Sequence, residues 1–189
     1  MTTCRGRIAA FVFACLLCGP AMSQDSKNDV PLPKTAAESI QSVFRGVENQ
    51  FTSVAEAMPA DKYSFAPTHG AFQGVRTFGQ QVKHVACANF AFFNEVEGKK
   101  PPEHCEGGGP SKATTKPELL QYLRDSFAYA NQVMATITPK NELDRVEGPY
   151  AGPNTKVGMA VIAVWHVTDH YGQLVEYARM NNIVPPSSR

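Results

Sequence analysis

The sequence has almost no net charge, because 18 lysines and arginines face 17 aspartates and glutamates among its 189 residues. A net charge of +1 excludes the global basic field that recruits nucleic acid. The chain also lacks an internal repeat, an alternating strand pattern and any apolar run of 18 or more residues. With 43% hydrophobic residues it is too apolar for a disordered chain. Length and composition therefore predict one globular domain with appendages.

Cysteine is scarce, and three of the five cysteines lie in the first 18 residues. That segment pairs two arginines with an unbroken apolar run over residues 8–18, which is the length of a signal h-region and too short for a membrane span. The small residues Ala21 and Ser23 then suit cleavage after residue 23. We therefore expect a signal peptide over residues 1–23, export to the periplasm or the exterior, and no integral membrane association after cleavage.

Cleavage would remove three cysteines and two arginines, and so change the net charge from +1 to −1. Residues 24–34 are polar, contain two prolines and predict a linker. Residues 35–189 have the apolar spacing of amphipathic helices. Capping boxes, in which a threonine precedes glutamate or glutamine by three residues, stand at Thr35, Thr77 and Thr115.

These signals predict helices over about 35–57, 77–96, 115–138 and 155–181. Their matched lengths favour an all-α four-helix bundle. The first half of the last helix, residues 157–165, is apolar nearly all round, so we expect it to be buried on most sides, with Trp165 in the core.

Histidines on two predicted helices could form one metal site. His166 and His170 are four residues apart, so their rings project from one helix face. Burying two imidazoles costs free energy unless each nitrogen finds a partner, which can be a shared metal ion or a hydrogen bond. His84 on the second predicted helix could add a third ligand, or it could be a core histidine with a hydrogen bond. Three converging histidines would leave coordination positions open, as catalytic sites do.

Three other metal centres are excluded by missing motifs. Val167 stands where a zinc protease needs glutamate between its histidines. Paired Glu-x-x-His motifs of di-iron bundles and a C-x-x-C-H haem motif are both absent from the sequence.

Two segments of the chain resemble the DinB-like superfamily of damage-inducible, metal-binding four-helix bundles. Residues 166–186 look like the final helix of that family, and residues 76–86 resemble its second helix, which carries the first metal histidine. The resemblance extends over residues 35–189. It implies an up-down-down-up bundle, one divalent metal ion bound by His84, His166 and His170, and often a homodimer.

Characterised members of the family are metal-dependent transferases, isomerases or hydrolases. The resemblance therefore implies a metal-dependent enzyme of hydrolase or transferase type with a small-molecule substrate or ligand. A non-catalytic bundle that binds a metal or another ligand is the alternative. Three imidazoles suit zinc, nickel, iron or manganese, so the metal is not named by its ligands.

Four further residues are candidates for the pocket or for the surroundings of the metal. Gln173 and Tyr177 share the helix face of His170, and Asp169 lies 100° round the helix from it. His69 precedes the second helix and could reach the mouth of the site. Core packing is the alternative for Tyr177, and a surface position is the alternative for Asp169 and His69.

Cys87 follows His84 by three residues, and three roles are open to it. A thiolate there could complete the metal shell and close the site, or it could act as a nucleophile. A disulfide between Cys87 and Cys105 is the third possibility, and export favours it.

Overall fold

Four long helices account for most of residues 31–189, the part of the chain described by this computed structural model. They are α1 (Ala36–Ala57), α2 (Phe78–Val96), α3 (Lys116–Met134) and α4 (Lys156–Met180). The predicted signal peptide and most of the predicted linker, residues 1–30 together, lie outside the described residues. Within the described range, every helix is too short or too polar to cross a membrane.

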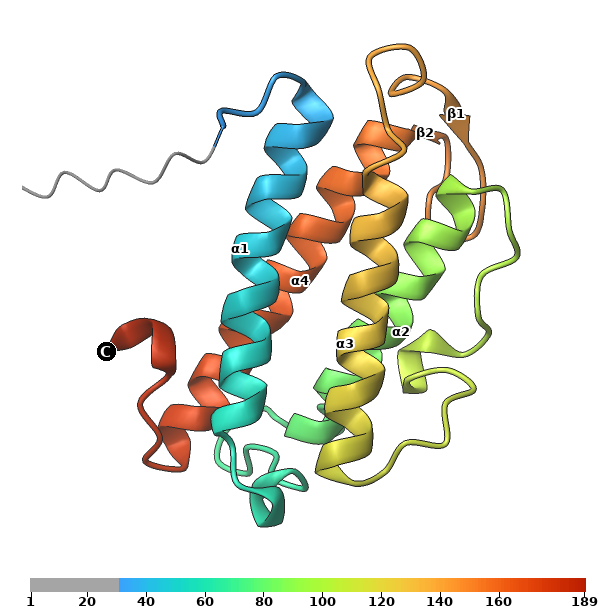
Figure 1. Cartoon of the computed structure of the whole chain (residues 1–189). Helices are drawn as coiled ribbons and strands as arrows, with labels where there is room; N and C mark the ends of the chain where they lie inside the picture. The colour runs from blue at the N-terminus through green and yellow to red at the C-terminus, as the bar shows by residue number, and fades with distance from the viewer. Residues whose placement is uncertain (1–30) are drawn as a thin grey trace, which may run out of the picture. The chain divides into compact units, whose positions relative to one another are not determined.

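The helices form a bundle in which α1 and α4 run in one direction and α2 and α3 in the other (Figure 1). Helices α2 and α3 run in the same direction because the connection over residues 97–115 carries the chain back along the bundle before α3 begins. The connections over residues 58–77 and 135–155 instead stay at one end of the bundle, so the helices that they join run antiparallel. The predicted up-down-down-up four-helix bundle is confirmed.

Threonine caps fix where the helices begin. At α2 the Thr77 hydroxyl accepts from the Gln80 backbone N–H at 3.2 Å, and the Gln80 side chain accepts from the Thr77 N–H at 2.8 Å. At α1 the Thr35 hydroxyl accepts from the Glu38 N–H at 3.1 Å, but the Glu38 carboxylate accepts from the N–H of Lys34 instead of closing the box. Each cap satisfies backbone donors that the first turn leaves free.

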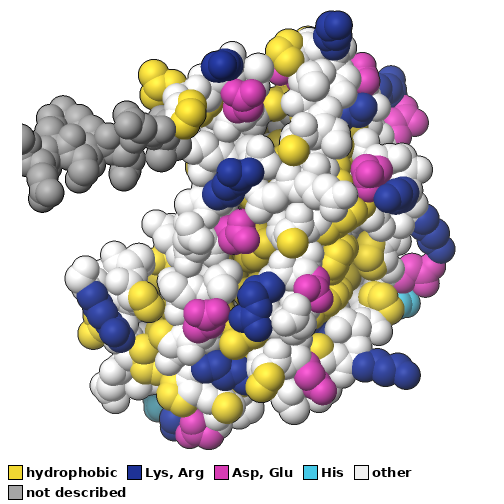
Figure 2. All heavy atoms as spheres, in the orientation of Figure 1, with side chains coloured by type: hydrophobic (Ala, Val, Ile, Leu, Met, Phe, Trp, Pro, Cys, Tyr) yellow, Lys and Arg dark blue, Asp and Glu magenta, His cyan; other side chains and the backbone are white. Residues whose placement is uncertain are grey.

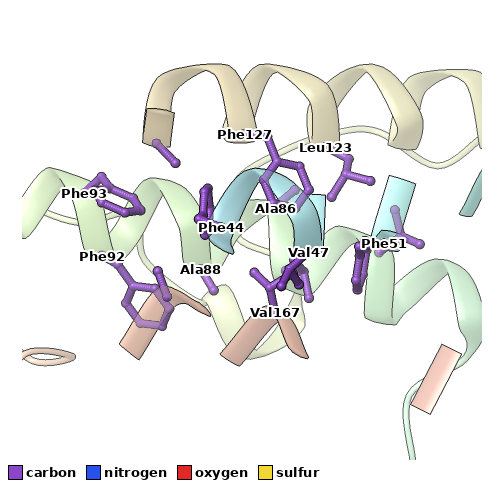
Figure 3. Close-up of a cluster of buried hydrophobic side chains, with 14 of the residues drawn as sticks. Phe44, Val47, Phe51, Ala86, Ala88, Phe92, Phe93, Leu123, Phe127 and Val167 are labelled. Atoms are coloured by element: carbon purple, nitrogen blue, oxygen red, sulfur yellow. The ribbon is translucent and has the colours of Figure 1, made fainter. Parts of the chain in front are cut away.

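Aromatic and aliphatic side chains from all four helices meet in the core (Figure 3). The ring of Phe44 packs on Phe93 and Phe127, with ring centroids 6.1 and 5.5 Å apart, and all three side chains are fully buried. Leu123 of α3 and Val167 of α4 close the cluster. The two helices that carry the candidate histidines, α2 and α4, are therefore held against each other by this core.

The connection from α3 to α4 differs from the sequence prediction. Helix α3 ends at Met134 rather than near Pro139, because the Thr136 hydroxyl donates to the Val133 carbonyl and the following residues form turns. Two strands of two residues, β1 (Arg145–Val146) and β2 (Asn154–Thr155), then pair antiparallel. Such short strands carry no alternating pattern, so the sequence could not indicate them.

The N-terminal half of α4 is more exposed than predicted. Trp165 is 67% exposed and Val161 is 51% exposed, so the expectation of burial on most sides and of Trp165 in the core is wrong. The helix packs with the opposite face, which carries Ala163 and Val167, both fully buried. A helix that is apolar all round gives no sequence signal for the face that packs.

Candidate metal centre

Three histidine side chains converge between α2 and α4. One ring nitrogen from each of His84, His166 and His170 lies within 4.8 Å of the other two. Nε2 of His84 and Nε2 of His166 are 3.1 Å apart. His84 and His170 are buried, and His166 is half-buried. The structure thus brings together the three residues that the sequence selected.

Helix geometry explains this convergence. His166 and His170 are separated by about one turn of α4, so both rings face α2 from neighbouring levels. On α2, His84 shares its side with Ala88 and Ala91, which are also buried. Small residues at these positions let the two helices approach closely enough for the rings to meet.

Burial keeps the three rings neutral. Desolvation lowers the pKa of His84 below its ordinary value. Burial, helped by the charges of neighbouring histidines, lowers the pKa of His166 to about 3 and that of His170 to about 4. At neutral pH each ring therefore offers a lone pair, which is the form that binds metal.

The hydrogen bonds of the rings suit a metal ion. His84 Nδ1 donates to the Cys105 carbonyl at 2.7 Å, so neutral His84 keeps an unprotonated Nε2. The Nδ1 atoms of His166 and His170 are buried without a hydrogen-bond partner among the described residues. Two nitrogens bound to one tetrahedral ion at about 2.0–2.1 Å would lie roughly 3.3 Å apart, close to the observed 3.1 Å. This donor set therefore fits zinc and related divalent ions.

Three of the other candidates lie on α4, within two turns of His170. The Gln173 side chain donates to the Asp169 carboxylate at 2.9 Å and accepts from the side chain of Gln81 at 2.6 Å. Asp169 itself is exposed. Tyr177 is buried, and its hydroxyl donates to the Arg76 carbonyl at 3.1 Å, which ties α4 to the residue before the α2 cap.

His69 is not brought into the site. It is exposed in the connection between α1 and α2, and its Nδ1 lies 3.2 Å from the hydroxyl of its neighbour Thr68. His69 stands outside the group of three histidines.

A cavity of about 470 Å³ opens one helical turn from His84 and His170. Its polar lining comes from Arg76, Gln80, Gln81, Glu106 and Gln173. The Arg76 guanidinium pairs with the Glu106 carboxylate, and its Nε donates to the Glu106 carbonyl at 3.0 Å.

The sequence gives little indication of what Arg76, Glu106 and Gln81 contact. From sequence alone Arg76 could bind an anion or pair with a carboxylate, and there is no signal for Glu106, which is 30 residues further along the chain. Gln81 was not singled out either. Gln81 lines the cavity, and its Oε1 is buried without a partner among the described residues.

Cys87 and Cys105 form a disulfide that spans 18 residues. Of the three roles left open for Cys87, the structure contains this one, and the sulfur is therefore neither a metal ligand nor a nucleophile here. Cys105 places its carbonyl on His84, a contact for which the sequence gave no signal.

The sequence model of the DinB superfamily matches residues 44–174, which is more than half of the chain. The chain belongs to the DinB superfamily. Among solved structures, the bundle is similar to a conserved protein from Enterococcus faecalis, with a TM-score of 0.62 and 14% identity over 78% of this chain and 97% of that one. No functionally curated protein matches the sequence.

A second similar solved structure is YfiT from Bacillus subtilis, described as a probable metal-dependent hydrolase with an unusual four-helix bundle topology. The TM-score is 0.61 and the identity 16%, over 83% of this chain and 94% of that one. At these identities both likenesses show the fold.

Proposed function

We propose that this DinB chain is a divalent-metal-dependent enzyme of hydrolase or transferase type that acts on a small polar molecule. The observation that carries the proposal is the convergence of His84, His166 and His170 as neutral, largely buried rings beside a cavity. Three protein ligands leave at least one coordination position for substrate or water, as in catalytic metal sites.

The three histidines would hold the ion, and nearby groups would orient them. When bound, a divalent ion supplies a Lewis acid that lowers the pKa of water and polarises a carbonyl. The Cys105 carbonyl fixes the ring of His84. Asp169 is held by Gln173 next to His170, and we assign it as a proton acceptor on the exposed side of the site.

The cavity favours a substrate that carries a negative group and a hydrogen-bond donor. A ligand anion would compete with the exposed Glu106 carboxylate for the Arg76 guanidinium, whose planar donors suit carboxylate and phosphate. A donor on the same ligand could bind to the amide oxygens of Gln80 or Gln173, whose side chains line the cavity. We therefore propose a small anionic substrate.

The non-catalytic bundle is the alternative function. The description of YfiT as a probable metal-dependent hydrolase supports the enzyme. A coordination shell completed by protein atoms alone would instead support a structural or storage role.

Metal analysis of purified protein tests the proposal. After incubation with Zn²⁺, Ni²⁺ or Mn²⁺ and desalting, we expect one ion per chain in the wild-type protein and in His69→Ala. His166→Ala and His84→Ala should lose it. Wild-type protein without stoichiometric metal would contradict the site, and X-ray absorption that finds no exchangeable oxygen ligand would contradict catalysis.

Three further expectations stay proposals. We propose that the chain is exported after cleavage at residue 23, which N-terminal sequencing of secreted protein would test. We propose a homodimer, which light scattering would test. We propose no nucleic-acid partner: basic and acidic side chains are interspersed on the face in Figure 2, and a gel-shift assay would test this.

A further inference from the structure

The connection between α2 and α3 reaches the metal centre through a backbone carbonyl. His84 Nδ1 donates to the Cys105 carbonyl, which lies in a short 3-10 helix over Cys105–Gly107. This hydrogen bond selects the ring orientation that turns Nε2 toward His166. Hydrogen bonds of this kind orient metal-binding histidines and raise their affinity.

The same loop approaches α2 more closely than a side chain would permit. A Cβ on Gly108 would lie 2.5 Å from Cγ of Lys83, and a Cβ on Gly109 would lie 2.3 Å from Sγ of Cys87. Both glycines also have positive φ angles. Gly108 and Gly109 therefore serve the docking of this loop on α2.

The disulfide and the hydrogen bond join the same two segments. Cys87 lies one helical turn after His84, and Cys105 is the residue whose carbonyl accepts from that ring. Both cysteines are buried, at 0% and 1% exposure, so the bond is shielded from thiols in solution.

We propose that the Cys87–Cys105 disulfide positions His84 as a metal ligand by holding the Cys105 carbonyl on its Nδ1. Cys105 is thus a positioning residue that acts through His84. This inference rests on the proposed metal site and adds a structural reason for its affinity.

Without the disulfide, little else would fix the loop. The connection carries four glycines and three prolines between Gly98 and Pro110, and ordering it costs conformational entropy. Its other tie to the start of α2 is Arg76, whose Nε donates to the Glu106 carbonyl at 3.0 Å and whose ion pair with the 80% exposed Glu106 side chain contributes little. The carbonyl would leave His84 for part of the time, and the ring would rotate.

The experiment compares full-length oxidised protein with the double variant Cys87→Ser/Cys105→Ser. Titration with Zn²⁺ against a chromophoric chelator measures the dissociation constant. We expect it to rise about 10- to 100-fold in the variant, the range found when such hydrogen bonds to metal ligands are removed. NMR of the metal-free protein should show a protected Nδ1–H resonance from His84 that broadens or disappears in the variant.

Lys100→Ala is the matched control, because it breaks the exposed Lys100–Glu103 ion pair in the same loop without touching His84. Its Zn²⁺ affinity and its His84 signal should equal those of the wild type. Wild-type protein that is reduced, desalted and measured anaerobically should behave as the double variant, and reoxidation should restore the affinity.

The possible results distinguish failure of the positioning role from failure of the proposed metal site. Equal Zn²⁺ affinities with and without the disulfide would overturn the positioning role. Loss of helix content by circular dichroism in the variant would overturn it too, since the disulfide would then brace the whole fold. If neither form binds metal, the proposed metal site fails, and an unchanged His84 signal would separately overturn the role of the disulfide.

Discussion

Helix α2 buries a charged or polar side chain near each of its ends, and the two differ in how their polar atoms are satisfied. Glu95 is 4% exposed, and its carboxylate accepts from the backbone N–H groups of Tyr150 at 3.0 Å and Ala151 at 2.7 Å. His84 is 5% exposed, and its group of three histidines contains two Nδ1 atoms without partners among the described residues. The chain satisfies the first cluster by itself and leaves the second incomplete.

This difference separates a structural group from a functional one. A buried carboxylate costs free energy unless hydrogen bonds replace its hydration, and Glu95 receives them from the connection before α4. That connection needs Gly148, because a Cβ there would lie 2.3 Å from Cδ of Glu95. An incomplete polar cluster also costs free energy, and binding of the proposed metal to the facing Nε2 atoms of His84 and His166 would offset part of that cost.

The largest expected effect on stability comes from breaking the satisfied cluster. Glu95→Ala leaves the N–H groups of half-buried Tyr150 and buried Ala151 without their carboxylate acceptor, so we expect the free energy of unfolding to fall by about 3–5 kcal/mol. Zn²⁺ affinity of the folded fraction should not change. Urea unfolding measures the change in stability, and competition with a chelator measures the Zn²⁺ affinity. Glu176→Ala, at an exposed position of α4, is the control and should shift stability by less than about 0.5 kcal/mol.

Replacing two histidines of the second cluster with apolar side chains should raise the stability of the metal-free protein. In His166→Leu/His170→Leu we expect the metal-free protein to gain about 1 kcal/mol, because buried unpaired nitrogens are replaced by carbon against Phe92. The wild-type protein should instead gain about 2.7 kcal/mol at Zn²⁺ concentrations 100 times the dissociation constant, and the variant should gain nothing. Unfolding curves with and without Zn²⁺ separate the two effects. A large loss of metal-free stability would show that the histidines hold the fold together.

The lowered pKa values of the buried histidines predict that the stability of the metal-free protein depends on pH. The pKa values of folded His166 and His170, about 3 and about 4, lie below the ordinary value of 6.5 that applies when the chain is unfolded. Between about pH 4 and pH 6.5 the unfolded chain therefore binds more protons, so stability rises with pH and levels off above 6.5. The difference in unfolding free energy between metal-free wild type and His166→Leu/His170→Leu should follow this curve. A difference that stays constant from pH 4.5 to 7.5 would contradict the burial of these rings.

The fold could be predicted because its determinants are local in sequence. Threonine caps at Thr77 and Thr115 mark helix starts to within a residue, and apolar spacing marks the packed faces of α1, α2 and α3. The spacing of His166 and His170 likewise placed them on one helix face.

The rest depends on partners that are distant in sequence or belong to the backbone. The acceptor for His84 is a carbonyl 21 residues away, and the donors for Glu95 are backbone N–H groups 55 and 56 residues away, for which no residue type provides a signal. Trp165 was misplaced for a related reason, since an all-apolar segment does not reveal its packed side. Sequence therefore identified the three converging histidines but not the groups that position them.

A third buried polar residue, between the two clusters, gives the finest test of the comparison. The Asn89 side chain on α2 donates to the Ser126 hydroxyl at 3.2 Å, while its Oδ1 has no partner among the described residues. If hydrogen-bonded polar contacts on α2 are structural, a double-mutant cycle of Asn89→Ala and Ser126→Ala should give a coupling free energy of about 0.5–1 kcal/mol. This coupling should be smaller than the stability lost in Glu95→Ala, because neither Asn89 nor Ser126 is charged. Zn²⁺ affinity should be the same in all four proteins. A change in that affinity would mean that the polar atoms of α2 act as one network, and that the distinction between its two ends is one of degree.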